Sequence, residues 1–150
     1  MIDGVHIWQA ELNGDSWPVL GRVLSHYLDR EPGPGELERG ERGKPRLREA
    51  RGLEFNLSHS GGIVLVAVAG RPVGVDVEAI VPKRGRTPGF YEEWVRREAR
   101  LKCLGLGVLD TPPDDPVAVE GLDLGPGCAA AVAVAGSEVG PLAFRSLEAG

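Results

Sequence analysis

Cysteine, lysine, aromatic residues and long apolar runs are all scarce in this chain of 150 residues. Cys103 and Cys128 are too few for a disulfide framework or a structural zinc site, so we expect buried thiols in a reducing compartment. No run of about 18 apolar residues occurs, and the first residues lack the basic-then-apolar order of a secretion signal. These absences predict a soluble cytoplasmic protein with no membrane partner, and any bound metal would need oxygen ligands.

The charged residues are unevenly spread. A net charge of −5 argues against a general nucleic-acid binder, yet the segment 30–51 is rich in arginine and partly offset by glutamate. This segment is either a solvated loop of mixed charge or a contact for a phosphate-rich ligand or an acidic partner. Only Lys44, Lys83 and Lys102 are lysines among 17 basic residues, and lysine supplies a compact point charge that suits phosphate.

The spacing of apolar residues predicts both strands and helices. We expect strands at 5–12, 62–70, 73–80, 116–124 and 128–136, with a weaker strand near 139–147. A helix is expected from Asp15 or Ser16 to about residue 30, and a second from Thr87-Pro88 to about Gly105. The strands at 62–70 and 73–80 are predicted to form a hairpin.

A short repeat indicates how these elements are grouped. The sequence VLVAVAG at 64–70 is echoed by AAVAVAG at 130–136. It predicts an α+β fold of two pseudo-symmetric subdomains, 1–70 and 71–150, each with a helix packed on a small, mostly antiparallel sheet. The other explanation is that two buried strands of alanine and valine simply look alike.

Two carboxylates share one face of a predicted strand. Asp76 and Glu78 alternate with Val75 and Val77, so both carboxylates point to one side while the valines enter the core. Hard oxygen ligands of this kind suit Mg²⁺. The simpler interpretation is a polar strand face.

The second helix carries Trp94, Glu98 and Lys102 at intervals of four residues, which places them along one side. A salt bridge between Glu98 and Lys102 would explain the pair. Alternatively, Glu98 adds a third carboxylate beside Asp76 and Glu78, and Lys102 adds a cation beside a phosphate.

Two further motifs contain turns. FNLSHSGG (55–62) ends a strand with Ser58 and His59, whose hydroxyl and ring nitrogen could contact a phosphate. The simpler interpretation is a turn with no role in binding. Serine hydrolysis fits poorly, since adjacent residues seldom face each other and no G-x-S-x-G elbow is present. RGKPRL (42–47) by itself is a basic turn.

In this order, GKPRL, FNLSHS, GVDVE and W-x-x-x-E-x-x-x-K closely resemble the motifs of 4′-phosphopantetheinyl transferases of the surfactin-synthetase (Sfp) type. The resemblance runs from about Val5 to about Gly136. It implies two pseudo-symmetric α+β halves with the active site between them.

The resemblance also implies roles for individual residues. Asp76, Glu78 and Glu98 would hold Mg²⁺ at the pyrophosphate of coenzyme A, Lys102 would contact those phosphates, and Glu98 would act as base. The segment Gly43, Lys44 and Pro45 would lie against the nucleotide, and Ser58 with His59 would contact the 3′-phosphate. A serine of an acyl or peptidyl carrier protein would attack the β-phosphorus and release 3′,5′-ADP. A monomer suffices, since one chain carries both halves.

Two departures from the family pattern leave a second hypothesis open. Family members carry a few tens of additional residues between the first strand and the first helix, where this chain has only Gly14 to Pro18. They also carry a phenylalanine-rich helix after the GVDVE-like motif, where this chain has a short connection. The chain is therefore either a compact working transferase or a module that binds a carrier protein or a nucleotide without transfer.

Overall fold

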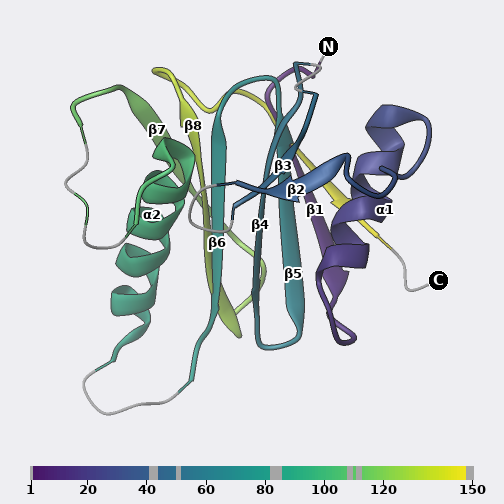
Figure 1. Ribbon diagram of the computed structural model, residues 1–150. Helices are drawn as coiled ribbons and strands as arrows, with labels where there is room; N and C mark the ends of the chain where they lie inside the picture. The colour runs from purple at the N-terminus through teal and green to yellow at the C-terminus, as the bar shows by residue number, and fades with distance from the viewer. Residues whose placement is uncertain are drawn as a thin grey trace.

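The computed structural model describes residues 2–40, 44–49, 52–81, 86–107, 110 and 113–147. Two β-sheets lie face to face, and one helix covers the outer side of each sheet (Figure 1). None of the helices in these ranges is long and apolar enough to cross a membrane. The elements are β1 (Val5–Glu11), α1 (Trp17–Leu28), β2 (Leu37–Arg39), β3 (Pro45–Leu47), β4 (Glu54–Ser60), β5 (Ile63–Ala69), β6 (Val73–Ala79), α2 (Pro88–Leu104), β7 (Val117–Leu122), β8 (Cys128–Ala135) and β9 (Leu142–Ser146).

The first sheet has the strand order β4-β5-β1-β9. Its pairs are antiparallel except for β9, which comes from the end of the chain and runs parallel to β1. Alternation along β5 sends Val64, Val66 and Val68 toward α1, while Leu65 and Ala67 face the second sheet. The β5 strand is therefore buried on both faces, as its continuous apolar run predicts.

The second sheet has the order β6-β8-β7 and is antiparallel throughout. Ala131 and Ala133 of β8 lie under α2, whereas Val132 and Val134 face the first sheet. The two strands of the sequence repeat, β5 and β8, thus hold equivalent positions between antiparallel neighbours. This arrangement confirms the predicted α+β fold class, while the division of the chain at residue 70 stays a prediction.

The predicted hairpin between β5 and β6 is wrong. Both edges of β5 are already paired, with β4 on one side and β1 on the other, so no edge remains for β6. The chain crosses to the second sheet through Arg71 and Pro72, whose carbonyl accepts a hydrogen bond from Ala135 N. The β6 strand then pairs with β8.

The helix boundaries agree with the caps expected from sequence. At α1, Asp15 Oδ1 accepts a hydrogen bond from Trp17 N, while Ser16 makes no capping bond through its side chain. At α2, Thr87 Oγ1 accepts from Phe90 N. The helix α2 ends at Gly105, whose φ of 71° is a left-handed conformation that glycine adopts readily.

The basic segment forms a small separate sheet. Strands β2 and β3 pair antiparallel and bring Arg46 and Arg48 to Glu38, and Arg30 pairs with Glu36. These arginines are largely exposed, so each ion pair contributes little to stability. For these three arginines, the structure agrees with a solvated segment of mixed charge.

The two sheets are joined at one edge by a ladder of side-chain hydrogen bonds. Side-chain oxygens of Asn56, Ser58 and Ser60 on β4 accept from Val75 N, Val77 N and Ala79 N on β6, at 2.8, 3.1 and 2.9 Å. Alternate residues of β4 therefore take the place of a partner strand along β6. Without these oxygens, the buried N–H groups of Val75 and Val77 would be unpaired, which is costly.

We expect Asn56→Ala to lower the free energy of unfolding by about 1 to 3 kcal/mol, because it leaves Val75 N–H buried without an acceptor. Urea denaturation of the variant and the wild type measures the change. Asn13→Ala, in an exposed loop, is the matched control and should change little. Equal stability of the two variants would show that the ladder is dispensable.

Candidate active site

A cleft of about 350 Å³ opens where β4 and β6 meet. Residues from all four sequence motifs line it, although the motifs are far apart in the chain. The predicted site residues on its walls are Pro45, Ser58, His59, Asp76, Glu78 and Lys102. The fold thus brings most of the predicted site together.

The helix α2 reaches the cleft because it lies very close to β6. A side chain at position 74 would collide with Ala99 O and Cys103 N of the helix, so Gly74 permits this approach. Lys102 Nζ then donates to Asp76 Oδ1 at 3.2 Å and to Val75 O at 3.0 Å. The ammonium group of Lys102 is held between the helix and the strand.

Asp76 is the most constrained of these residues. Its side chain is only 7% exposed, and Oδ1 accepts from both Lys102 and Ser58. The other oxygen, Oδ2, is buried and has no hydrogen-bond partner among the described residues. Burial raises the pKa of Asp76 to about 6; Lys102 opposes this rise, and the charges of Glu78 and Glu98 add to it.

The residues around Asp76 fit a magnesium ion that is completed by other ligands. Among the described residues, no group of three or more His, Cys, Asp or Glu side chains is arranged to hold a metal ion. Mg²⁺ commonly binds one or two carboxylates and takes its remaining ligands from water and substrate phosphates. The unpartnered Oδ2 of Asp76 and the neighbouring Glu78, which also lines the cleft, suit that mode.

Glu98 is half-buried on α2 and is not among the residues that line the cleft. Its carboxylate is close enough to raise the pKa of Asp76. Lys102 forms its salt bridge with Asp76. A salt bridge between Glu98 and Lys102 is therefore not needed to explain the position of Lys102.

Lys44 lies beside the cleft with its ammonium turned into the protein. Its Nζ donates to Lys102 O at 3.2 Å and to Val73 O at 3.4 Å, and burial lowers its pKa. It therefore binds the C-terminal end of α2, where a cation is favourable. Its neighbour Pro45 lines the cleft, and Gly43 lies outside the described residues.

Ser58 and His59 lie in strand β4, with the turn only at Gly61 and Gly62, and they differ in exposure. Ser58 is buried at 6% exposure and its hydroxyl is bound to β6, whereas His59 is exposed at the cleft. Adjacent residues of a strand point to opposite sides, which accounts for the difference.

Two residues outside the four motifs also line the cleft, Ser16 and Arg39, and sequence reasoning did not place them there. The guanidinium carbon of Arg39 lies 4.5 Å from the centre of the Trp17 ring, an arrangement typical of a cation–π contact. The basic segment signalled an arginine-rich surface, but no spacing rule connects Arg39 with Trp17, because they meet only through tertiary packing.

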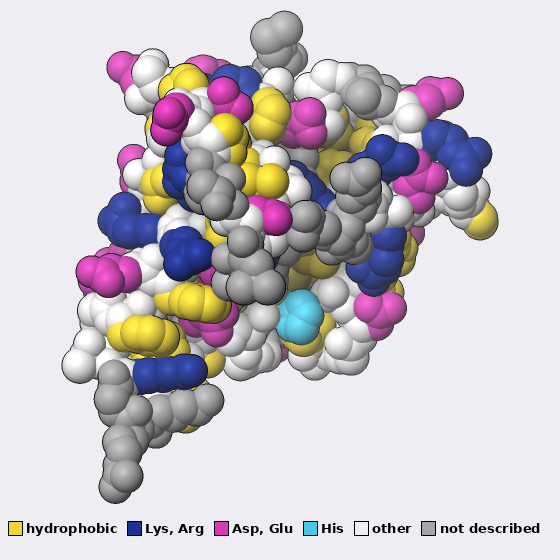
Figure 2. Space-filling model, turned by 60° about the vertical axis from the view of Figure 1, so that its left-hand side comes forward, with side chains coloured by type: hydrophobic (Ala, Val, Ile, Leu, Met, Phe, Trp, Pro, Cys, Tyr) yellow, Lys and Arg dark blue, Asp and Glu magenta, His cyan; other side chains and the backbone are white. Residues whose placement is uncertain are grey.

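The surface beside this cleft carries both signs of charge. Figure 2 shows the face on the α2 side, where basic and acidic side chains are interspersed and a histidine side chain is exposed. A ligand here would be held by local contacts more than by a long-range field of one sign.

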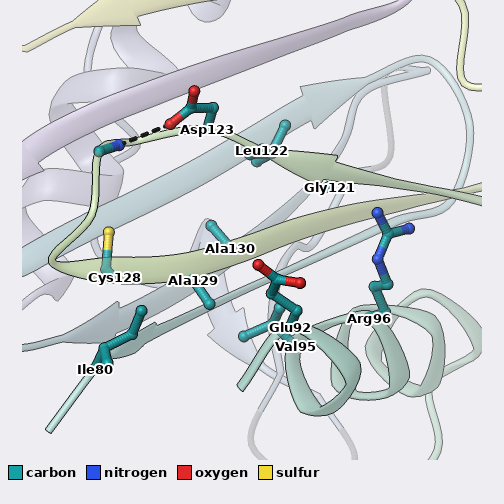
Figure 3. Close-up of a pocket in the computed structure, with 11 residues that line it drawn as sticks. Ile80, Glu92, Val95, Arg96, Gly121, Leu122, Asp123, Cys128, Ala129 and Ala130 are labelled. Atoms are coloured by element: carbon teal, nitrogen blue, oxygen red, sulfur yellow. Dashed lines mark hydrogen bonds between the residues drawn. The ribbon is translucent and has the colours of Figure 1, made fainter. Parts of the chain in front are cut away.

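A second cavity, of about 330 Å³, lies on the other flank of α2 beside β7 and β8 (Figure 3). Glu92 and Arg96 of α2 and Asp123 contribute its charged groups, over a floor that includes Val95 and Ala129. None of the predicted site residues lines it. It is therefore separate from the cleft at β6, because the strand order places β7 at the opposite edge of the sheet.

Known proteins provide an independent comparison. No family model matches the chain. The 4′-phosphopantetheinyl transferase HetI of Nostoc sp. is 33% identical, over 79% of this chain and 68% of its own length. The corresponding transferase psf-1 of Bacillus pumilus is 52% identical and Sfp of Bacillus subtilis is 25% identical, each over 60% of this chain and 50% of its own length.

These relatives define the class of protein, since each is named a 4′-phosphopantetheinyl transferase. This chain belongs to the 4′-phosphopantetheinyl transferase family, which confirms the resemblance seen in its motifs. It spans about two thirds of the length of HetI and half of the length of psf-1 and Sfp.

We expect Asp76→Asn to stabilise the metal-free protein at neutral pH. With its pKa raised to about 6, Asp76 favours the folded state when protonated, and this stability is present below the unfolded pKa and is lost as pH rises through about 6. The asparagine variant does not undergo this loss, so it should exceed the wild type by about 1 to 3 kcal/mol at pH 8.

Urea denaturation at pH 5 and pH 8, in the presence of a chelator, measures both proteins. The stability advantage of Asp76→Asn should grow with pH. An advantage that stays constant or shrinks would show that the Lys102 ion pair outweighs the cost of burial.

Proposed function

We propose that this protein transfers the 4′-phosphopantetheine group of coenzyme A to a serine of an acyl or peptidyl carrier protein, as a cytoplasmic monomer. The cleft at β4 and β6 carries the proposal, because it gathers Pro45, Ser58, His59, Asp76 and Lys102 from four separate motifs. The names of the relatives support the same activity.

Mg²⁺ is the metal that this proposal requires, with Asp76, Glu78 and Glu98 as its ligands. Because these three do not form a metal-binding group among the described residues, their side chains would have to adjust to the ion and its substrate phosphates. When bound, it would supply positive charge to the pyrophosphate of coenzyme A and so favour departure of the nucleotide. The unpartnered Oδ2 of Asp76 supports this assignment. Burial is the main cause of the raised pKa of Asp76, and Glu78 and Glu98 are close enough to add to it.

The residues of the chain account for the remaining chemistry. Lys102 would add a fixed charge beside the phosphates, and Glu98 would accept the proton of the carrier serine, directly or through a water. The serine oxygen forms a bond to the β-phosphorus, the bond from that phosphorus to the nucleotide oxygen breaks, and 3′,5′-ADP leaves. His59 would contact the 3′-phosphate and Pro45 would lie against the nucleotide, and positioning of the reactants would supply much of the rate.

We expect incubation with Mg²⁺ and coenzyme A to add about 340 Da, the mass of phosphopantetheine, to a serine of an apo carrier protein. Intact mass spectrometry of a panel of acyl and peptidyl carriers measures the addition, with a transferase of known activity as the positive control. If every carrier stays unmodified while the control works, the chain is a binding module and not a transferase.

We expect Asp76→Ala, Glu98→Ala and Lys102→Ala each to reduce transfer by about 10²-fold or more, because each acts on charge that develops at the phosphates. Arg96→Ala, on the other flank of α2, is the matched control and should retain activity. Initial rates measure the effect, and melting temperatures check that each variant folds. Wild-type rates in any of the three would remove that residue from the site.

A further inference from the structure

Ser58 contacts both the backbone and a carboxylate of β6 through one hydroxyl group. Its Oγ accepts from Val77 N at 3.1 Å and donates to Asp76 Oδ1 at 3.3 Å. A hydroxyl has one hydrogen, and because Val77 N–H is itself a donor, that hydrogen goes to Asp76. Donation to a phosphate, the role implied by the family resemblance, would require Ser58 to release Asp76.

The hydrogen bond from Ser58 restricts how the Asp76 carboxylate can turn. The terminal torsion of an aspartate is broad, so its orientation is set by its partners. Both donors to Asp76, Ser58 from β4 and Lys102 from α2, act on Oδ1. Oδ2 is thereby left without a partner among the described residues.

We infer that Ser58 is a positioning residue, which holds the Asp76 carboxylate so that Oδ2 is the oxygen left to bind the metal. This inference rests on the proposed function. It predicts that Ser58 affects the rate of transfer and the affinity for Mg²⁺, with little effect on the affinity for coenzyme A in the absence of the metal.

Ser60 provides a matched control. Its Oγ accepts from Ala79 N at 2.9 Å in the same ladder, and among the described residues it makes no hydrogen bond to a carboxylate. Ser58→Ala and Ser60→Ala therefore each remove one ladder acceptor, but only Ser58→Ala also removes a donor to Asp76. Ser58→Thr keeps the hydroxyl and tests whether it restores function.

The experiment measures kcat with an apo carrier protein, and the dissociation constants of coenzyme A and Mg²⁺ by calorimetry. A hydrogen bond to a charged group is large enough that Ser58→Ala should lower kcat by about tenfold or more. The same variant should bind Mg²⁺ more weakly. Measured with a chelator, so that the metal does not couple the two ligands, its affinity for coenzyme A should stay within roughly threefold of the wild type. Ser60→Ala and Ser58→Thr should keep kcat within roughly threefold.

Two results would overturn the inference while leaving the proposed function intact. A weaker affinity for coenzyme A with an unchanged kcat in Ser58→Ala would make Ser58 a nucleotide contact. Equal kcat in Ser58→Ala and Ser60→Ala would reduce Ser58 to a member of the ladder. A wild-type protein that modifies no carrier would instead refute the proposed function, and this inference with it. Melting temperatures check folding, and if Ser58→Thr does not fold, the two alanine variants decide.

Discussion

The hydrogen-bond ladder between β4 and β6 is the interaction on which the rest of the structure depends. It satisfies three N–H groups on the edge of β6 that faces β4 with side-chain oxygens of Asn56, Ser58 and Ser60, and so fixes the register of one sheet against the other. Because Asp76 and Glu78 alternate with the bonded residues of β6, that register also places them in the cleft between the sheets. A polar seam of this kind allows a ligand site to open beside a tightly packed apolar core.

The cleft holds charge at a cost to stability. Burial of Asp76 raises its pKa to about 6, and its oxygen Oδ2 has no hydrogen-bond partner among the described residues. An apolar residue at this position would have neither the buried charge nor the unpaired oxygen. Perturbed groups of this type cluster at functional sites. A divalent cation would remove the cost when bound, so the same feature that weakens the free protein would favour metal binding.

The two lysines near the cleft have different hydrogen-bond partners. The ammonium group of Lys102 donates to the carboxylate of Asp76, and the ammonium group of Lys44 donates to the backbone carbonyl of Lys102. Lys44 is therefore connected to the Asp76–Lys102 pair through the backbone, and Ser58 is connected to it through a side chain. Both residues come from the N-terminal part of the chain, so the pair depends on Lys44, which directly precedes β3, and on β4 as well as on α2 and β6.

Local patterns in the sequence determined much of this protein. The alternation in GVDVE placed two carboxylates on one strand face, the spacing of Trp94, Glu98 and Lys102 placed them along one helix, and the ordered motifs identified the family. Only the tertiary structure decided which strands pair, because β5 and β6 are adjacent in sequence but β5 has no free edge. It likewise decided that the side chains of Ser58 and Lys44 point into the protein and that Arg39 lines the cleft. These contacts join distant segments and depend on how the two sheets pack, and the local periodicity of the sequence does not specify that packing.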